Sequence, residues 1–247
     1  MTEAGGGPQT VERFGRLVRT FSIAVSAAAV AGAWARQEDA PAGSTVVVER
    51  EISALGRIGQ AWEVPPERTL AFAIVLRPPI GPDVADACWL VASLGFLTGA
   101  ASVVSADLSA WWPDRVVDTA TGATVAGTKV EVQLGPAEVR AAIAVVRVDL
   151  AALGLEAPGR GEELLEAVLR ATDDVATGLS EGTDALASAY SEQCGLVGKR
   201  VKLRLLPTGE KRGTVRGVDG GGGLELTSAT GMVERISVDS LRELVVV

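Results

Sequence analysis

The sequence predicts an α+β fold, in which a mixed β-sheet with packed helices is followed by a small β-barrel at the C-terminus. Up to residue 194, apolar and β-branched runs bounded by glycine and proline alternate with longer stretches rich in helix formers. From residue 197 onward, the chain changes to five short strand patterns separated by turn signals. Five strands in so short a stretch indicate a barrel.

Length and composition agree with this division. The chain has 247 residues, of which 47% are hydrophobic and 22% are charged, and such values are typical of folded globular proteins. We expect a disordered tail over residues 1–10, because its run of three glycines and a proline cannot pack. One large domain is then expected over residues 11–194 and the barrel over residues 195–247.

The large domain begins with a predicted helix over residues 11–37, which contain good helix formers and no proline. A Pro-Ala-Gly turn at residues 41–43 ends it. Strands are predicted at residues 45–51 and 70–77, with an irregular segment between them. Residues 83–100 are expected to form a buried central helix that is capped by Asp83.

Three further strands and two helices complete the predicted domain. The strands cover residues 103–108, 129–134 and 141–150, and a Gly-Pro turn makes the last two antiparallel neighbours. The helices cover residues 162–178 and 183–193. The first of these helices carries an apolar stripe that consists of Leu164, Leu165, Val168, Leu169 and Val175.

The barrel strands are predicted at residues 200–206, 213–218, 223–227, 232–238 and 241–246. Between two of them, four consecutive glycines from Gly220 to Gly223 follow Asp219. This tract lacks the helix and the lysine that follow a phosphate-binding loop. We therefore expect a flexible hairpin turn there.

Charge and residue usage exclude several classes of function. The net charge of −8 disfavours binding to nucleic acid, whose phosphates repel an acidic surface. The chain has no histidine, so the usual general base and every Ser-His or Cys-His nucleophile are excluded. Cys88 and Cys194 lie far apart with no paired spacing, which predicts reduced, partly buried thiols, with neither a disulfide nor a metal site.

The N-terminal region leaves two cellular locations open. Three arginines precede an apolar run at residues 21–35 that ends in small residues, so residues 11–35 could act as a signal peptide for export. Against this, the run is rich in alanine, is too short to span a bilayer and leads directly into a strand pattern. The favoured interpretation is a cytoplasmic protein that does not engage membranes.

Residues 54–62, with the sequence Ala-Leu-Gly-Arg-Ile-Gly-Gln-Ala-Trp, resemble the Gly-Arg-Gly-Arg-x-Gly-Arg-x-Trp loop of biotin protein ligases. The similarity continues at residues 111–115, in the place of Lys-Trp-Pro-Asn-Asp, and at residues 124–131, in the place of Lys-Leu-Ala-Gly-Ile-Leu-x-Glu. The segment that starts at Val197 is similar to the SH3-like C-terminal domain of that family. The resemblance therefore implies a biotin/lipoate ligase-like fold over residues 11–247.

A member of this family would join biotin to the α-phosphate of ATP and pass the biotinyl group to a lysine of a carboxylase carrier domain. The resemblance thus implies biotin and MgATP as ligands, if the chain is active. The resemblance contains no DNA-binding domain, so we do not expect the repressor role that some family members have. The positions of this sequence that it suggests for ligand binding are Ser26, Glu51, Gly56, Arg57, Gly59, Trp62, Trp112 and Gly127.

The same positions show how far this sequence departs from the family pattern. The motif lysines are replaced by Trp111 and Thr124, and Arg57 is the one loop arginine that remains. Glu51 stands where the family has glutamine. The Ser-Thr-Asn that opens the ligand helix appears here as Ser-Ala-Ala at residues 26–28, and the family's Gly-x-Gly-x-Asn appears as Ala-Ile-Ala-Val-Val at residues 142–146. No residue is therefore predicted to be catalytic.

Two functions follow from this depleted site. Loss of one donor aimed at developing charge costs roughly 10²–10³ in rate, so we expect a protein that no longer ligates and instead binds or regulates a carrier domain or another ligase-family subunit. The alternative is an active ligase with relocated charges among Arg57, Arg115, Lys129 and Arg147. An unrelated binding protein is a further possibility. The bulk of Trp111 also predicts a shrunken or closed cleft between residues 54–62 and 111–115.

Overall fold

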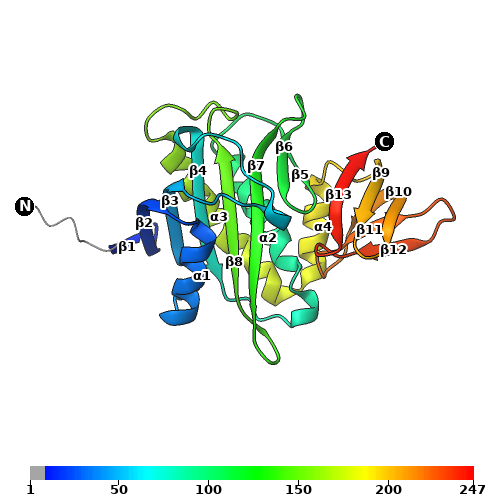
Figure 1. Cartoon of the computed structure of the whole chain (residues 1–247), viewed down its shortest axis with the longest axis horizontal. Coiled ribbons are helices and arrows are strands. Elements are labelled where there is room, and N and C mark those ends of the chain that lie inside the picture. The colour runs from blue at the N-terminus through cyan, green and yellow to red at the C-terminus, as the bar shows by residue number, and fades with distance from the viewer. Residues whose placement is uncertain (1–8) are drawn as a thin grey trace, which may run out of the picture.

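The computed structural model describes residues 9–247 and contains two β-sheets (Figure 1). Residues 1–8 of the predicted tail lie outside the described residues, and Thr10, which was also assigned to that tail, opens the first strand. The larger sheet has the order β1-β2-β3-β4-β8-β7-β6-β5. Its β2 and β3 are parallel and its other neighbours are antiparallel, so the prediction of a mixed sheet is confirmed. Its strands are β1 (Thr10–Arg13), β2 (Arg16–Ala24), β3 (Thr45–Glu51), β4 (Thr69–Leu76), β5 (Leu108–Trp111), β6 (Arg115–Asp118), β7 (Thr124–Leu134) and β8 (Val139–Asp149).

The predicted N-terminal helix over residues 11–37 is wrong in its first half. The chain forms the hairpin β1–β2, and the helix α1 (Ala27–Gln37) begins only after Ala24. Phe14 and Gly15 both have positive φ, at 54° and 70°, and so make the tight turn that the sequence pattern did not reveal. Ser26 then starts the helix, because its Oγ accepts a hydrogen bond from the N–H of Ala29 at 3.1 Å.

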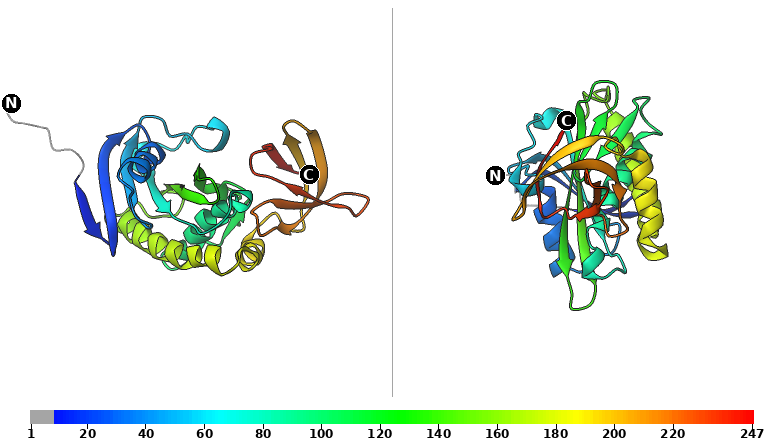
Figure 2. Two further views of the ribbon diagram at one scale, coloured as in Figure 1. Left: turned by 90° about the horizontal axis from the view of Figure 1, so that it is seen from below. Right: turned by 90° about the vertical axis from the view of Figure 1, so that its right-hand side faces the viewer.

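Helices cover both faces of the larger sheet. Helix α1 packs on one face, against β3, β4 and β8. Helices α2 (Ala87–Ala100), α3 (Arg160–Glu181) and α4 (Thr183–Gln193) form the layer on the other face, where α3 runs as a long rod beneath the sheet (Figure 2). The predicted stripe on α3 is confirmed for four buried residues, Leu164, Leu165, Val168 and Leu169, whereas Val175 is partly buried.

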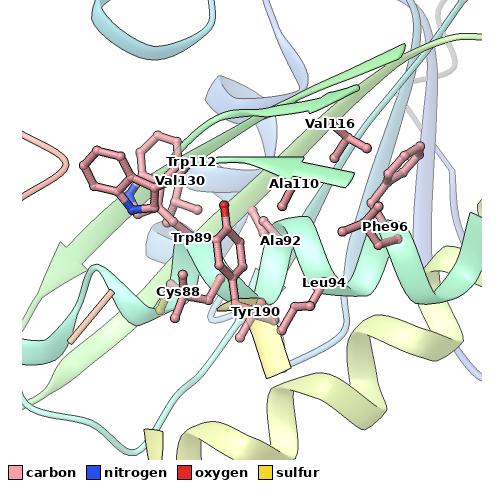
Figure 3. Close-up of a cluster of buried hydrophobic side chains, with 14 of the residues drawn as sticks. Cys88, Trp89, Ala92, Leu94, Phe96, Ala110, Trp112, Val116, Val130 and Tyr190 are labelled. Carbon is pink, nitrogen blue, oxygen red and sulfur yellow. The ribbon is translucent and has the colours of Figure 1, made fainter. Parts of the chain in front are cut away.

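Helix α2 is the predicted central helix, and every residue in it except Thr98 is buried. It starts later than expected, since residues 82–84 make a separate 3₁₀ turn and Asp83 caps nothing. The cluster around it includes Trp112 and Tyr190, whose rings approach α2 from β5–β6 and α4 (Figure 3). Cys88 and Cys194 are free and buried, as predicted, and burial raises the pKa of the Cys88 thiol to about 12.

The strand predicted at residues 103–108 is also wrong. The N–H groups of Val103 and Val104 both bond back to the carbonyl of Ala100 at 2.9 Å, so these residues close the end of α2 and do not enter a ladder. Strand β5 begins at Leu108, and β6, which the sequence pattern did not predict, follows after the Trp-Pro-Asp turn at residues 112–114. No helix within residues 9–247 has the length and hydropathy needed to cross a bilayer.

The C-terminal sheet has five antiparallel strands in the order β12-β11-β10-β9-β13, as predicted in number and place. Alternate residues of its strands face a small apolar core that includes Val201, Leu203 and Leu224. Its strands are β9 (Arg200–Leu205), β10 (Gly209–Val218), β11 (Leu224–Thr227), β12 (Val233–Ile236) and β13 (Leu241–Val246).

The glycine tract forms the predicted turn between β10 and β11, but it is packed against the large domain and does not stand free. A Cβ on Gly222 would lie 2.3 Å from the carbonyl oxygen of Asp86, and the φ of Gly222 is +84°. The carbonyl of Gly222 accepts a hydrogen bond from Trp112 Nε1 at 2.9 Å. Only a residue without a side chain allows backbone to meet backbone this closely, so the tract is one of the places at which the two domains join.

We expect Gly222→Ala to lower the free energy of unfolding by about 2–5 kcal/mol, from the left-handed backbone and the clash together. Gly231→Ala is the matched control, because Gly231 has nearly the same φ, +82°, and nothing within 4 Å of its missing Cβ. That variant should lose only about 1–2 kcal/mol. Urea unfolding of both variants measures the difference, and equal losses would show that the contact with Asp86 contributes nothing.

Asp86 itself is partly buried beneath the barrel, where its Oδ2 accepts from the N–H of Val238 at 3.3 Å. Burial raises the pKa of this carboxyl above its usual range, and the carboxylates of Asp239 and Asp219 add to the shift. The N–H of Val238 and the guanidinium of Arg235 oppose it. The junction therefore carries a carboxyl group that folding makes harder to ionise.

Asp86→Asn should remove a pH dependence from stability. A carboxyl whose pKa is raised by folding stabilises the folded state below its ordinary pKa, and this contribution is lost as the pH rises through the higher, folded-state pKa. The stability of the wild type should therefore fall relative to that of the variant as the pH rises from about 4, the ordinary aspartate value. Urea unfolding across this range tests the idea, and curves that stay parallel would contradict it.

Candidate functional site

The segment between β3 and β4 folds over the same sheet face as α1. Leu55 and Ala61 form an isolated bridge, and the N–H of Gly56 donates to the carbonyl of Gln60 at 2.7 Å. The N–H of Trp62 donates to the carbonyl of Ala54 at 2.8 Å. Residues 54–62 are therefore a closed loop, which we call the cleft loop. Among its predicted ligand residues, Gly59 has a φ of +77° and nothing near its Cβ position.

Arg57 is buried and does not face solvent. Its Nε donates to Asp114 Oδ2 at 2.9 Å and its Nη1 donates to the carbonyl of Leu241 at 2.6 Å. These two bonds join the cleft loop to the β5–β6 turn and to β13 of the barrel. The loop arginine that survives from the family pattern is thus held by this chain's own acceptors.

Glu51 and Arg147 form an ion pair in which each side chain is only 3% exposed. Arg147 donates from Nη2 to Glu51 Oε1 at 2.9 Å and from Nε to Oε2, and its Nη1 reaches the carbonyl of Leu55 at 3.3 Å. Glu51 also accepts from the N–H of Ala27 at 2.8 Å. The pair therefore fills the place where the start of α1, the end of β3, the cleft loop and β8 meet.

Trp62 and Gly127, both predicted site residues, are brought together. A Cβ on Gly127 would lie 3.2 Å from Cζ3 of Trp62, so a larger residue in β7 would push the ring away. The indole Nε1 of Trp62 donates to Thr69 Oγ1 at 3.0 Å and fixes the ring above the sheet. The Trp62 ring therefore forms one wall of the cleft, and Gly127 leaves room for it.

The structure contradicts the expectation that Trp111 fills the cleft. Its ring lies away from the cleft, near the Arg115 guanidinium and Lys199 Nζ, at 5.7 and 5.2 Å from the ring centroid. Trp112 is 1% exposed and holds Gly222, so it joins the domains. Ser26 serves as the cap of α1.

A cleft remains between the cleft loop and the β5–β6 turn, but it is divided. A pocket of about 330 Å³ is bounded by the cleft loop, Arg115, β7 and Arg147. A second pocket, of about 250 Å³, lies toward β13, and both are lined by Arg57 and Asp114. The first volume is at the low end of the ~300–1,000 Å³ of ligand pockets. The Arg57–Asp114 ion pair borders both pockets, and Trp111 lines neither of them.

The charges proposed as relocated are brought together in part. Arg57, Arg115 and Arg147 line the larger pocket, and two of them are in the ion pairs described above. Within residues 9–247, Arg115 has no carboxylate at ion-pair distance. Lys129 lines neither pocket and is paired with Glu131 at 2.8 Å.

The sequence did not identify Asp114 as a site residue, nor Arg147 as the particular arginine that pairs with Glu51. One signal for the latter was available, since Arg147 is the only charged residue in an otherwise apolar run over residues 141–148. A single cation inside a buried strand indicates a buried anion that faces it. Which anion it would be depends on the fold.

Arg147→Ala should lower the free energy of unfolding by about 3–5 kcal/mol, because it leaves Glu51 buried without its partner. Arg68→Ala is the matched control. Arg68 Nη2 bonds both oxygens of Asp149 at 3.0 and 2.8 Å, but the arginine is 46% exposed, and we expect a loss of about 1 kcal/mol or less. Calorimetric or urea unfolding measures both losses of stability. Similar losses for the two variants would mean that the Glu51 pair contributes no more than a surface contact.

Comparison with known proteins agrees with the resemblance. Residues 196–240 match the family described as the biotin protein ligase C terminal domain. Similar solved structures include the biotin protein ligase of Aquifex aeolicus in complex with biotin and ATP, at 17% identity and a TM-score of 0.70 over 93% of this chain and 99% of that chain. A biotin protein ligase-like protein of unknown function from Silicibacter sp. TM1040 has 16% identity and a TM-score of 0.70, over 92% and 96%.

A third similar structure is the biotin acetyl coenzyme A carboxylase synthetase of Helicobacter pylori with bound biotinylated ATP, at 14% identity and a TM-score of 0.58 over 88% and 98%. No curated protein matches the chain significantly. At these identities the structural likeness establishes the fold. The chain is therefore biotin protein ligase-like: it has the fold of these enzymes, and its last module matches their C-terminal domain.

Proposed function

We propose that this protein does not adenylate biotin and that it acts as a binding or regulatory partner in biotin and carboxylase metabolism. The observation that carries the proposal is the buried Glu51–Arg147 pair. Its binding partner would be a carboxylase carrier domain or another ligase-family subunit. The free, buried state of both cysteines supports a reducing compartment such as the cytoplasm.

The pair uses groups that the family resemblance assigns to the ligand. Glu51 stands in the glutamine position at the end of β3, and both of its oxygens bind Arg147. The carbonyl of Leu55, in the cleft loop, accepts from the same guanidinium, and the N–H of Ala27, in the ligand-helix motif, donates to Glu51. A small molecule would have to displace a desolvated ion pair to reach these groups, which costs several kcal/mol.

The cations around the cleft are equally unsuited to the reaction of biotin with MgATP. Adenylation needs cations or donors aimed at the charge that develops on phosphate. Arg57 is already committed to Asp114 and Leu241, and the two motif lysines are Trp111 and Thr124. Arg115 alone among the lining cations is without an acidic partner in the described chain. The residues that line the cleft therefore do not fit biotin and MgATP as reacting ligands.

One observation favours the alternative of an active ligase. Arg57, Arg115 and Arg147 line the same pocket, and the similar Aquifex aeolicus ligase was solved with biotin and ATP bound. If Arg57 and Arg147 exchanged their carboxylates for a phosphate, three guanidinium groups would surround it. This alternative predicts that Arg57→Ala abolishes turnover.

We expect no heat of binding when the pure protein is titrated with biotin in the presence of MgATP, and no biotinyl-AMP in the same mixture by mass spectrometry. A ligase of known activity, run in parallel, establishes the sensitivity. Detection of biotinyl-AMP would overturn the proposal, and its loss in Arg57→Ala would then identify the loop arginine as part of the site. Binding without adenylate would indicate a biotin sensor.

A further inference from the structure

Strand β13 has one free edge. It is the last strand in the order β12-β11-β10-β9-β13, so among residues 9–247 it pairs only with β9. The N–H of Val247 donates to the carbonyl of Arg200 at 2.9 Å. This bond shows which backbone N–H and C=O groups of β13 face β9 and which face away. Because the direction of these groups alternates along an antiparallel ladder, the N–H and C=O of Leu244 and Val246 point away from β9.

This edge lines the pocket of about 250 Å³. Five consecutive residues of β13, from 241 to 245, take part. A strand face would contribute alternate residues, so the lining comes from the edge of the strand. The opposite wall consists of Arg57 and Gln60 from the cleft loop and of residues 112–115, and we call this space the edge groove. Figure 2 shows β13 at the side of the barrel that faces the large domain.

One end of the edge groove is unavailable for pairing with another strand. The carbonyl of Leu241 is held by Arg57 Nη1 at 2.6 Å, and a bulge between Leu241 and Glu243 breaks the register with β9. The unpaired groups of Leu244 lie beyond this bulge in the edge groove, and those of Val246 follow next to the groove's lining residues. An incoming strand would therefore pair at the C-terminal part of β13.

The charges around the edge groove do not balance. Its two carboxylates already have partners, since Asp114 binds Arg57 and Glu243 binds Arg204. Among its arginines, Arg115 and Arg242 have no carboxylate at ion-pair distance within residues 9–247, and Arg242 donates only to backbone carbonyls. Two uncompensated guanidinium groups therefore flank an unpaired strand edge.

We propose that the edge groove binds an extended, acidic segment of a partner protein, which adds a strand to β13. Backbone hydrogen bonds from Leu244 and Val246 supply the attachment, as in other strand additions. Arg115 and Arg242 select acidic side chains through charge-assisted hydrogen bonds. The inference goes beyond the proposed function and stands whether or not the cleft forms an adenylate.

The test uses a fluorescent ten-residue peptide of alternating valine or threonine and glutamate, with a second peptide in which lysine replaces glutamate. In anisotropy titrations of the full chain, we expect the glutamate peptide to bind at least tenfold more tightly. Arg115→Gln combined with Arg242→Gln should weaken it about tenfold or more. Arg212→Gln is the matched control, because this exposed arginine lies on β10, two strands away from β13, and should leave binding unchanged.

A backbone test separates strand addition from simple charge attraction. Peptides N-methylated at every second residue, in the two alternate registers, should differ, with one register abolishing binding and the other retaining it. Hydrogen exchange at the Leu244 amide should slow when the peptide binds. The proposal is overturned if neither peptide binds below about 1 mM, if the lysine peptide binds equally well, or if N-methylation in both registers has no effect. None of these results depends on the biotin titration.

Discussion

A buried guanidinium needs hydrogen-bond acceptors, and Arg57 finds two of them in other segments of the chain. The cleft loop supplies the side chain, the turn between β5 and β6 supplies Asp114, and β13 supplies the carbonyl of Leu241. These bonds connect the cleft loop, the β5–β6 turn and the barrel, and Arg57 and Asp114 border both pockets of the cleft. The contact of Gly222 with Asp86 secures the same junction from its other side.

The positions that align with the family motifs have two different roles in this structure. Trp62 and Gly127 still shape a wall of the cleft, and Trp112 ties the sheet to the barrel. At the positions that the resemblance assigns to ligand binding, Glu51 and Arg57 each form an ion pair with another part of this chain. A fold can therefore keep a family's architecture while its polar groups satisfy one another.

Much of the fold could be predicted from patterns of a few residues. Strand β3 and helix α4 have the predicted bounds, because β-branched runs and helix formers are local signals. The prediction of an N-terminal helix was wrong because Phe14, a large residue, adopts a positive φ that is uncommon for such a side chain. The prediction for Trp111 was wrong for another reason, since its ring lies beside Lys199, a residue far away in the sequence.

The site was predictable only as a set of positions. Arg57 and Asp114 are 57 residues apart, and Glu51 and Arg147 are 96 apart. Nothing along the chain states which cation meets which anion, since that follows from strand order. The resemblance placed Arg57, Trp62 and Gly127 around one cleft, whereas the two ion pairs became visible only when the strands were assembled.

The Glu51–Arg147 pair also bears on the history open to this protein. Loss of either partner alone strands a buried charge, while replacement of both by apolar or neutral residues is often neutral or even stabilising. A lineage that acquired the pair can therefore leave it only through a destabilised intermediate or through two nearly simultaneous substitutions. Single substitutions at either position are therefore disfavoured, and the chain keeps or loses this pair as a unit.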